Sequence, residues 1–497
     1  MSETPLSTGD ETEAARAQNY VGGEWRDPAG EGEQEVVDSA TGERVGVTPF
    51  SDAADVDEAV ARANEAFEDW SARPVEERIQ PLFELKRLLE EHQDDLAEVL
   101  VEEHGKTFAE AKGELRRGIE NVEVACGMPT MLQAGHLPNA APDIDETAVR
   151  QPLGVFTAVT PFNFPGMIPL WFLPYAVASG NAFVLKPSER TPFTARKLFE
   201  LIDEAGFPDG VVNLVNGGPD TVNALLAHDD VVGASFVGST PVAKHVYETA
   251  AKHGKRVQAQ GGAKNHILVS ESADLDFAAE QTVSSAFANS GQRCLANPVA
   301  VVHGDVYEEF ADRVVDEAES LTVGAGLDED TEMGPLVTAD HEATVREYVE
   351  TGVEEGATLL LDGRERDADL PEEGHYLTPT VFGDVDPEMT IARDEIFGPV
   401  LALIRAEDFD DALSVLNRSE YGNAASVFTE RGAEAKRFRH EAEAGNLGVN
   451  VGTAAPMAFF HFGGRKASFF GDLHAQGDDM VRFYTDETVY IERWPEE

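Results

Sequence analysis

The chain has 497 residues, of which 42% are hydrophobic, and this size and composition predict a globular protein of two or three domains. It carries 93 acidic and 38 basic residues, a net charge of -55, which argues against nucleic acid and anionic membranes as partners. Two cysteines are too few for a disulfide framework, so the composition favours a reducing, cytoplasmic compartment.

The acidic residues are spread along the whole chain and do not form one tail. Carboxylates distributed in this way hold water and cations, which favours a salt-adapted (halophilic) surface, with a merely acidic cytosolic enzyme as the alternative. Residues 1–17 are polar and acidic and lack the basic and apolar parts of a signal peptide, so we expect a flexible tail there. No apolar run is long enough to span a bilayer.

The first part of the chain is predicted to be mainly helical. Short strands and turns come first, at residues 20–25, 36–37 and 44–47. Apolar residues at helical spacing then predict helices over residues 57–70, 78–101 and 108–128. The prolines within residues 138–142 break this pattern, and a short strand is expected at residues 147–151.

From residue 154 the pattern changes to alternating strands and helices. Strands are predicted at residues 155–159, 182–185, 211–215, 234–237 and 267–269, and helices at 168–178, from 192, at 222–226 and at 242–253. Strands and helices that alternate at this spacing predict a parallel, doubly wound sheet. Such sheets bind ligands beyond the carboxyl ends of their strands, so the loops at those ends are candidate binding segments.

The half from residue 274 onward predicts a second α/β domain, with strands at residues 299–302, 400–405 and 425–428 and a helix at 306–321. The last stretch, residues 481–494, alternates apolar and polar side chains and is predicted to be an exposed strand. It could pair with residues 147–151 in a protruding flap. Because exposed strand pairs invite association unless another subunit covers them, we expect an oligomer.

Residues 287–296 read F-A-N-S-G-Q-R-C-L-A and place Cys294 at the end of a small, Gly-containing turn. Backbone amides and the Arg293 guanidinium close to the sulfur would lower the thiol pKa and favour the thiolate, the form that attacks carbonyls. Most free cysteines are instead small buried hydrophobic residues, and this stretch alone leaves that interpretation open.

The strongest cofactor signal is the stretch A-F-V-L-K-P-S-E at residues 182–189. It ends a predicted strand with Lys186 and Glu189, a cation and a carboxylate at the rim of a parallel sheet. A carboxylate there can accept both hydroxyls of an adenosine ribose and would repel a 2′-phosphate, which favours NAD over NADP. A surface Lys–Glu pair is the alternative.

A second cofactor signal is F-V-G-S-T-P at residues 236–241, which ends a strand and opens a helix. Thr240 is the expected N-cap and Pro241 the first helical residue. Gly238 would let a phosphate come close, and the helix N-terminus would favour its charge. An ordinary capped helix is the alternative, and no G-x-G-x-x-G fingerprint supports a standard Rossmann site.

Asn163 follows the first strand of the predicted sheet, in the stretch T-P-F-N-F-P. Its side-chain amide could donate to the oxyanion of a tetrahedral intermediate beside a thiolate, or it could be an ordinary Asn in a turn. The histidines are scattered and no pair has ligand spacing with a carboxylate or cysteine partner, so no metal site is expected.

The stretches P-F-N-F-P, K-P-S-E, F-V-G-S-T, G-Q-R-C and E-I-F-G-P resemble, in order and spacing, the aldehyde dehydrogenase superfamily over about residues 20–494. The resemblance implies an α/β, aldehyde dehydrogenase-like fold with two doubly wound parallel-sheet domains and a small β oligomerisation flap. It also implies Cys294 as the nucleophile and Asn163 as the oxyanion donor. The residues implied to hold NAD are Thr160, Phe162, Lys186, Glu189, Arg190, Gly238, Ser239, Gly261, Glu395 and Phe397.

With this resemblance the chain is predicted to divide into three parts behind the tail. Residues 18–132 and 152–262 would form the NAD-binding domain, residues 263–472 the catalytic domain that carries Cys294, and residues 133–151 and 473–497 the oligomerisation flap.

One position departs from the superfamily pattern. Most members carry a Glu in an E-L-G-G-K stretch as the base that activates water, whereas this chain has Gln260 there, and an amide cannot act as a general base. The stretches G-A-K-N-H, P-F-N-F-P-G-M-I-P-L-W, K-P-S-E-R and A-P-M-A-F-F resemble the methylmalonate-semialdehyde dehydrogenase subgroup, which implies a role in valine catabolism. That subgroup lacks the Glu and transfers its acyl group to coenzyme A, a thiol that needs less activation than water.

The subgroup resemblance assigns Arg117 and Arg293 to a substrate carboxylate, which suits a bidentate guanidinium. A helix-surface ion pair for Arg117 and tuning of the thiolate by Arg293 are the alternatives. The implied reaction is NAD-dependent oxidation of methylmalonate or malonate semialdehyde to propionyl-CoA or acetyl-CoA and carbon dioxide, in a homotetramer built as a dimer of dimers. A hydrolytic dehydrogenase, for example for succinate semialdehyde, and a catalytically silent NAD-binding structural protein remain as alternatives.

Overall fold

The computed structural model describes residues 15–365 and 370–494. Residues 1–14 of the predicted tail lie outside the described residues. Its last residues belong to the fold, because Ala15–Arg16 form strand β1 and Ala17 is buried. β1 pairs in parallel with β5 (Arg44–Pro49), which pairs with β4 (Glu33–Val37) in a small sheet.

The first half of the chain is built on a sheet of strand order β22-β12-β11-β8-β9-β10-β2-β3. The strands from β12 to β10 run parallel, as predicted. Their bounds are β8 (Val155–Val159), β9 (Ala182–Lys186), β10 (Val212–Leu214), β11 (Val231–Val237) and β12 (Arg256–Gln260). The antiparallel outer strands are β2 (Asn19–Val21), β3 (Glu24–Arg26) and β22 (Phe469–Gly471).

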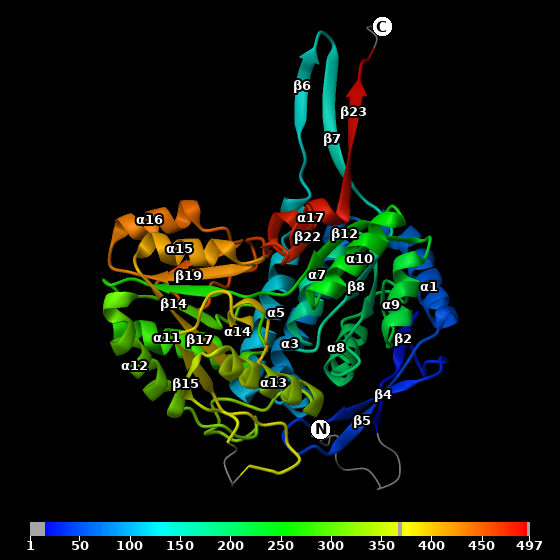
Figure 1. The fold of residues 1–497 in the computed structure, drawn as a ribbon. Helices are drawn as coiled ribbons and strands as arrows, with labels where there is room; N and C mark the ends of the chain where they lie inside the picture. The colour runs from blue at the N-terminus through cyan, green and yellow to red at the C-terminus, as the bar shows by residue number, and fades with distance from the viewer. Residues whose placement is uncertain (1–14, 366–369, 495–497) are drawn as a thin grey trace.

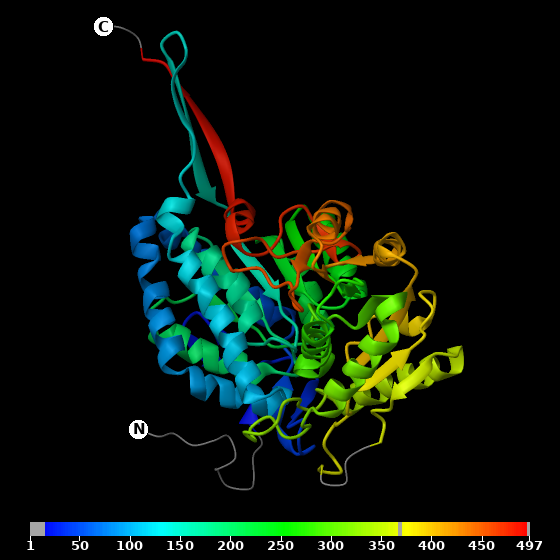
Figure 2. The same ribbon diagram turned by 90° about the vertical axis from the view of Figure 1, so that its left-hand side faces the viewer.

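Helices cover both faces of this sheet. One face carries α1 (Ala53–Ala72), α9 (Pro219–Ala227) and α10 (Thr240–Lys252). The other carries α3 (Gln80–Glu91), α4 (Gln93–His104), α5 (Phe108–Ala125), α7 (Met167–Ala178) and α8 (Pro192–Glu204), seen as the left-hand layer of Figure 2. Every residue of α7 is buried, as its unbroken apolar sequence requires. The short helices α2 (Val75–Arg78) and α6 (Met128–Met131) complete this region.

The second half has its own sheet, of order β15-β16-β17-β14-β13-β19-β20, parallel except for β15. Its strands are β13 (His266–Val269), β14 (Val299–His303), β15 (Thr358–Leu361), β16 (Thr380–Gly383), β17 (Val400–Ala406), β19 (Ala424–Phe428) and β20 (Asn446–Val449). α11 (Leu275–Phe287) and α12 (Tyr307–Glu319) cover one face. α13 (Ala339–Glu355), α15 (Phe409–Arg418) and α16 (Gly432–Glu441) cover the other, which confirms the second α/β sheet.

The remaining short elements also belong to the second half of the chain. They are α14 (Thr390–Arg393), the 3-10 helices η1 (Ala288–Gly291) and η2 (Gly304–Val306), and the paired strands β18 (Tyr421–Gly422) and β21 (Arg465–Lys466).

A flap projects from the body of the molecule (Figure 1). It is an antiparallel sheet in the order β23-β7-β6, formed by β6 (His136–Ala141), β7 (Ile144–Pro152) and β23 (Thr485–Glu492). The predicted pairing of 147–151 with the C-terminal strand is confirmed. The prediction omitted β6, because its proline suggested a break in structure. Residues 481–484 are not part of the strand but end α17 (Gly477–Tyr484).

Three other sequence predictions need correction. The helix predicted over residues 78–101 is interrupted at His92, which leaves α-helical geometry with φ -103° and ψ 20°. Residues 267–269, predicted to close the first sheet, lie within β13 at the centre of the second. Strand β12 was missed because its sequence R-V-Q-A-Q is short and carries only two apolar residues, Val257 and Ala259.

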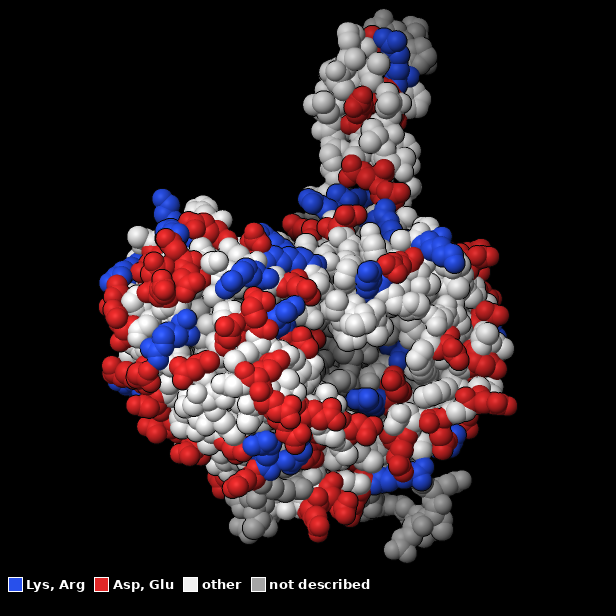
Figure 3. Space-filling model, viewed as in Figure 1, with Lys and Arg blue, Asp and Glu red and all other residues white. Residues whose placement is uncertain are grey.

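The surface is strongly acidic on the face seen in Figure 3, with Asp and Glu spread over both halves. Among the described residues, no helix has both the length and the apolar character needed to cross a membrane.

Candidate active site

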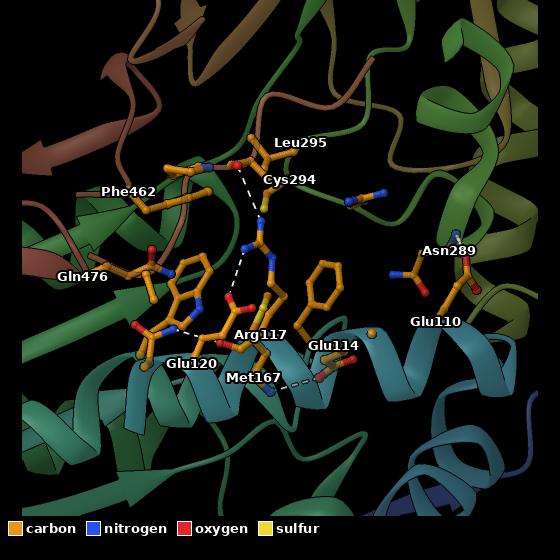
Figure 4. A pocket seen from close by; sticks show the side chains of 18 of the residues that line it. Glu110, Glu114, Arg117, Glu120, Met167, Asn289, Cys294, Leu295, Phe462 and Gln476 are labelled. Atoms are coloured by element: carbon orange, nitrogen blue, oxygen red, sulfur yellow. Dashed lines mark hydrogen bonds and ion pairs between the residues drawn. The ribbon is translucent and has the colours of Figure 1, made fainter. Parts of the chain in front are cut away.

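A cavity of about 380 Å³ lies beside Cys294. Helices α5 and α7 contribute to its lining, as do the turn at residues 288–295 and the segment 455–462. Figure 4 shows Arg117 projecting from α5 toward Cys294. Much of the rest of the lining is apolar and includes Phe164, Trp171 and Phe462. A mostly apolar cavity with a few convergent polar groups is typical of a small-molecule site.

The turn before Cys294 has an unusual backbone. Asn289, Ser290 and Gly291 all adopt left-handed conformations, with φ of 56°, 54° and 72°. A side chain at Gly291 would lie 2.1 Å from the backbone oxygen of Gly398, so only glycine fits. Ser290 Oγ donates to the oxygen of Gly334 at 2.6 Å and helps to hold the turn. Strained backbone that the surroundings hold firmly is typical of functional sites.

The main chain of Cys294 is fixed by two side chains to which the sequence assigned no role. Asn265 Nδ2 and Asn423 Nδ2 both donate to the Cys294 carbonyl oxygen, at 2.9 and 2.8 Å. Each Asn directly precedes a strand, and these strands, β13 and β19, are neighbours in the second sheet. The sequence signals these two residues only by placing an Asn before each strand, and that position does not identify the Cys294 carbonyl as their hydrogen-bond partner.

The prediction that the environment lowers the Cys294 pKa is wrong. Burial raises the pKa of the thiol from 9.0 to about 11. Arg293 and the backbone N–H groups of Cys294 and Leu295 lower the pKa as expected, but they do not offset the burial. The thiol is therefore protonated at neutral pH in this state, and reaction requires that a base accept its proton.

Asn163 lies next to the turn that carries Cys294. Its side-chain Nδ2 donates to the backbone oxygen of Gln292 at 3.0 Å, and its own carbonyl accepts from Lys106 Nζ at 2.6 Å. Asn163 is buried, with 5% of its surface exposed. A primary amide has two N–H donors, so one stays available beside the turn that carries Cys294.

The two arginines assigned to a carboxylate both line the cavity. Arg117 also forms an ion pair with Glu120, at 3.0 Å, and donates to the oxygen of Ala455 at 3.5 Å. Arg293 has no side-chain hydrogen bond or ion pair among the described residues, and burial lowers its pKa. The cavity therefore holds one guanidinium that makes no direct ion pair among the described residues, although the Glu110 carboxylate acts on its charge, and a second that is paired with Glu120.

Lys186 and Glu189 lie together at the carboxyl end of β9, with Nζ 3.0 Å from Oε2. Burial opposes ionisation of Glu189, but the charges of Lys186 and Arg190 hold the pKa of that carboxyl below its usual value. The Arg190 guanidinium stacks over the Phe162 ring at 5.8 Å. Phe162 meets Phe397 edge to face, with ring centroids 6.0 Å apart. The structure thus brings Phe162, Arg190 and Phe397 together.

The start of α10 differs from the prediction by one residue. Ser239, not Thr240, is the N-cap, and no side chain caps the helix. Thr240 Oγ1 instead accepts from the backbone N–H of Gly262 at 2.8 Å. Gly238 N–H donates to the Gln260 oxygen at 3.1 Å, so the loop with Gly238 and Ser239 lies against the end of β12. An uncapped helix start offers backbone N–H groups to a phosphate.

Glu395 lies near the loop that follows β12. Its Oε1 accepts from the backbone N–H of Ala263 at 2.8 Å, and burial raises the pKa of its carboxyl to about 7. Gly261 N–H donates to the oxygen of Ser468 at 2.8 Å. A Cβ at Gly262 would lie 2.3 Å from Glu395 Oε2, so a larger residue there would displace the Glu395 carboxylate.

Two buried polar atoms in the segments that surround this region, Thr160 Oγ1 and Gln260 Nε2, have no hydrogen-bond partner among the described residues. Such atoms are costly to bury unless a ligand or water satisfies them. Together with the uncapped α10 and the ionised Glu189, they fit a dinucleotide. Gln260 ends β12 and does not line the cavity beside Cys294.

A buried ion pair between the cavity and Asn163 was not anticipated from the sequence. Lys106 Nζ lies 2.6 Å from Glu114 Oε2, and both side chains are fully shielded from solvent. Both residues line the cavity. The pattern T-F-A-E at residues 107–110 is a capping box that starts α5, the helix that carries Glu114 and Arg117.

Glu271, His303 and Asp305 come close enough together to bind a cation. Glu271 already pairs with Arg431, and His303 Nδ1 accepts from the Asp305 backbone N–H at 3.2 Å. None of the three residues lines the cavity beside Cys294. Since other groups already engage two of the three ligands, the cluster supports no metal site.

Comparison with known proteins shows the family of the chain. Residues 25–489 match the model of the aldehyde dehydrogenase family. A malonate-semialdehyde dehydrogenase of Geobacillus thermodenitrificans is 47% identical over 489 residues, which cover 98% of this chain and 100% of that protein.

Two solved structures are also closely similar. A putative methylmalonate-semialdehyde dehydrogenase from Sinorhizobium meliloti, complexed with NAD, has a TM-score of 0.96 and 40% identity, covering 98% of this chain and 99% of that one. A methylmalonate-semialdehyde dehydrogenase from Oceanimonas doudoroffii has a TM-score of 0.95 and 42% identity, and the match covers 97% of this chain and 99% of that one.

Proposed function

Because the chain belongs to the aldehyde dehydrogenase family, we propose that it oxidises methylmalonate and malonate semialdehydes with NAD and coenzyme A. The products are propionyl-CoA or acetyl-CoA, carbon dioxide and NADH. The names of the most similar relatives support the substrate class. The observation that carries the proposal is the cavity that places Arg117 and Arg293 beside Cys294.

The two arginines select for a carboxylate on the aldehyde. Arg293 makes no direct ion pair among the described residues, and Arg117 reaches the same cavity from α5. A guanidinium can bind a carboxylate through two parallel hydrogen bonds, which gives both energy and direction. Since the nucleophile is adjacent to Arg293, a short semialdehyde held by its carboxylate presents its carbonyl to Cys294.

The first chemical step is addition of the Cys294 sulfur to the aldehyde carbon. The thiol gives its proton to solvent water, the resulting thiolate forms a carbon–sulfur bond with the aldehyde carbon, and the carbonyl oxygen takes the electron pair of the broken π bond and becomes an oxyanion. The free N–H of the Asn163 amide and a backbone N–H of the turn stabilise that oxyanion. NAD, when bound, accepts the hydride that converts this adduct into a thioester on Cys294.

Release of the product needs no base from the protein. The substrate carboxylate is β to the thioester carbonyl, so it leaves as carbon dioxide and the resulting enolate takes a proton. Coenzyme A then attacks the thioester as a thiolate, forms the acyl-CoA, and returns Cys294 as the leaving thiolate. Gln260 stands where a water-activating Glu would be, and its amide accepts no proton. The chain therefore favours transfer to a thiol over hydrolysis.

NAD is held by the groups already described along the first sheet. Lys186 and Glu189 bind the adenosine ribose, and the uncapped N-terminus of α10, at Gly238 and Ser239, accepts the pyrophosphate. Glu395 and Phe397 contact the nicotinamide half. The remaining residues of the pocket are Thr160, Phe162, Arg190 and Gly261.

The enzyme is further proposed to be a cytoplasmic, salt-adapted homotetramer that acts in valine breakdown. The flap presents apolar side chains to solvent: Leu137, Val149, Val489, Tyr490 and Ile491 are 59%, 38%, 54%, 45% and 67% exposed. Apolar residues on an exposed sheet call for a covering subunit. The net charge of -55 supports function in high salt.

The experiment that tests the function is product analysis in high salt. The protein is incubated with malonate semialdehyde, NAD and coenzyme A, and the products are separated by mass. Acetyl-CoA, carbon dioxide and NADH in equal amounts support the proposal. Formation of free malonate or acetate with no acyl-CoA contradicts it, and favours a hydrolytic enzyme.

A further inference from the structure

We propose that Lys106 and Glu114 form a buried clamp that positions Asn163 as the oxyanion donor. The inference rests on the proposed function, in which Asn163 stabilises the oxyanion, and adds two positioning residues to it. Neither residue needs to touch the substrate for this role.

The clamp holds the loop that carries Asn163 at two points. Lys106 Nζ donates to the Asn163 carbonyl oxygen at 2.6 Å and lies 4.2 Å from the centre of the Phe164 ring. Glu114 Oε1 accepts from the backbone N–H groups of Gly166 and Met167, at 2.8 and 3.0 Å. Glu114 thus caps α7, whose own N-cap glycine has no side chain to do so.

The ion pair between the two residues joins these points into one unit. Lys106 Nζ lies 2.6 Å from Glu114 Oε2, and neither side chain is exposed to solvent. Removing one partner would leave an uncompensated buried charge, whereas the intact pair has every charge satisfied. The loop is therefore held between a lysine in the connection from α4 to α5 and a glutamate within α5.

Asn163 is consequently fixed at both ends. Its carbonyl is held by Lys106, and its side-chain amide donates to the Gln292 oxygen at 3.0 Å. The carbonyl also accepts a longer bond, of 3.5 Å, from Asn289 Nδ2 in the turn before Cys294. Without Lys106, the Asn163 carbonyl oxygen loses its shortest hydrogen bond. The second N–H of the Asn163 side-chain amide can then move away from the position of the oxyanion. A small displacement of such a donor is costly, because oxyanion stabilisation depends on donor distance.

The test uses a double substitution that leaves no buried charge. Lys106→Met with Glu114→Gln removes both charges and keeps an acceptor for the α7 N–H groups. The rate constant for NADH formation in a single turnover reports acylation. The rate of Cys294 alkylation by iodoacetamide reports the nucleophile without any oxyanion. We expect acylation to fall about 10–100-fold while alkylation changes by less than about threefold.

A double-mutant cycle with Asn163→Ala separates positioning from a merely structural role. If the clamp acts through Asn163, the double substitution costs less than about twofold in the Asn163→Ala background. An equal loss of acylation rate in the wild-type and Asn163→Ala backgrounds would overturn the proposal that the clamp positions Asn163. If Asn163→Ala alone leaves acylation unchanged, the oxyanion role fails, and the clamp with it. That outcome differs from a failure of the clamp alone.

Glu103→Gln is the matched control. Glu103 is also a buried carboxyl at a helix start, where it accepts from the backbone N–H groups of Phe193 and Thr194 at 2.8 and 2.9 Å. These two hydrogen bonds do not involve the loop that carries Asn163. We expect this variant to lower the thermal midpoint and keep the acylation rate constant. Equal losses of acylation in the control and in the clamp variant would mean that lost stability, not positioning, is the cause.

Discussion

The side chain of Asn163 donates to the backbone oxygen of Gln292 at 3.0 Å, two residues before Cys294, the proposed nucleophile. This bond joins the loop after β8 of the first sheet to the turn after α11 of the second half. The proposed oxyanion donor and the proposed nucleophile therefore come from separate halves of the chain. They are linked by this bond and by a longer one, of 3.5 Å, from Asn289 Nδ2 to the Asn163 carbonyl oxygen. The chemistry depends on the two halves staying together.

The arginines should matter only for substrates that carry a carboxylate. Arg293→Met is expected to lower kcat/KM for malonate semialdehyde about 10–100-fold, because a charged hydrogen-bond pair is lost. Arg117→Met should act in the same direction with a smaller loss, since Arg117 is already shared with Glu120. The measurement is steady-state NADH formation.

Propionaldehyde, which has no carboxylate, is the control substrate for this prediction. Its kcat/KM should change by less than about threefold in both variants. Equal losses for both aldehydes would show that the arginines tune the thiolate and do not bind the substrate. Arg293→Lys should recover only part of the loss, because an ammonium cannot form two parallel bonds.

The reactivity of Cys294 should rise steadily with pH. Burial raises the pKa of the thiol to about 11, so in the free enzyme the thiolate is a small fraction at neutral pH. Below that pKa the thiolate fraction rises about tenfold per pH unit, and alkylation by iodoacetamide should follow it. A plateau below pH 8 would mean that the thiolate already predominates there, contrary to the effect of burial.

Glu189 should determine the preference for NAD. Its carboxyl is ionised, because Lys186 and Arg190 hold the pKa below its usual value in spite of burial. Glu189→Gln is expected to raise the KM for NAD about 10-fold and to lower the KM for NADP, since the repulsion of a 2′-phosphate is gone. Glu200→Gln, an exposed ion-paired residue on α8, is the control and should leave both constants unchanged. An unchanged preference for NAD over NADP in Glu189→Gln would contradict the assignment of Glu189 to the adenosine ribose.

Gln260→Glu should restore hydrolysis. Gln260 is buried and its Nε2 has no partner among the described residues, so a carboxyl there has few groups to stabilise its charge. Burial raises a carboxyl pKa toward neutrality, which suits a general base. Turnover without coenzyme A should rise about 10-fold or more. Gln258→Glu, two residues earlier in β12, is the matched control and should show no such gain.

Much of the fold could be predicted from the sequence because its strands and helices alternate with strong patterns. Strand β9 and the signal at residues 182–189 are examples, since a fully buried apolar run ends in polar residues that lie at the rim. Strand β12 was missed because arginine and glutamine interrupt its pattern, and β22 joins it from a segment about 200 residues away.

The site was predicted less completely than the fold, for a physical reason. The residues beside Cys294 in sequence suggested a lowered pKa, but burial depends on distant segments and outweighs them. Lys106 and Glu114 were missed for the same reason, because Lys106 contacts Asn163 across 57 residues of the chain and Glu114 contacts Gly166 across 52. Asn265 and Asn423 likewise bind the Cys294 carbonyl oxygen from positions that are distant in the sequence.

The dependence of NADH formation on coenzyme A tests the central claim most directly. Malonate semialdehyde and NAD are mixed with the enzyme in high salt, and NADH is followed with and without coenzyme A. The proposed function predicts a burst of about one NADH per Cys294 without coenzyme A, followed by slow turnover, and sustained turnover once coenzyme A is added. Equal steady-state rates under both conditions would contradict it, because the thioester would then be released without a thiol acceptor.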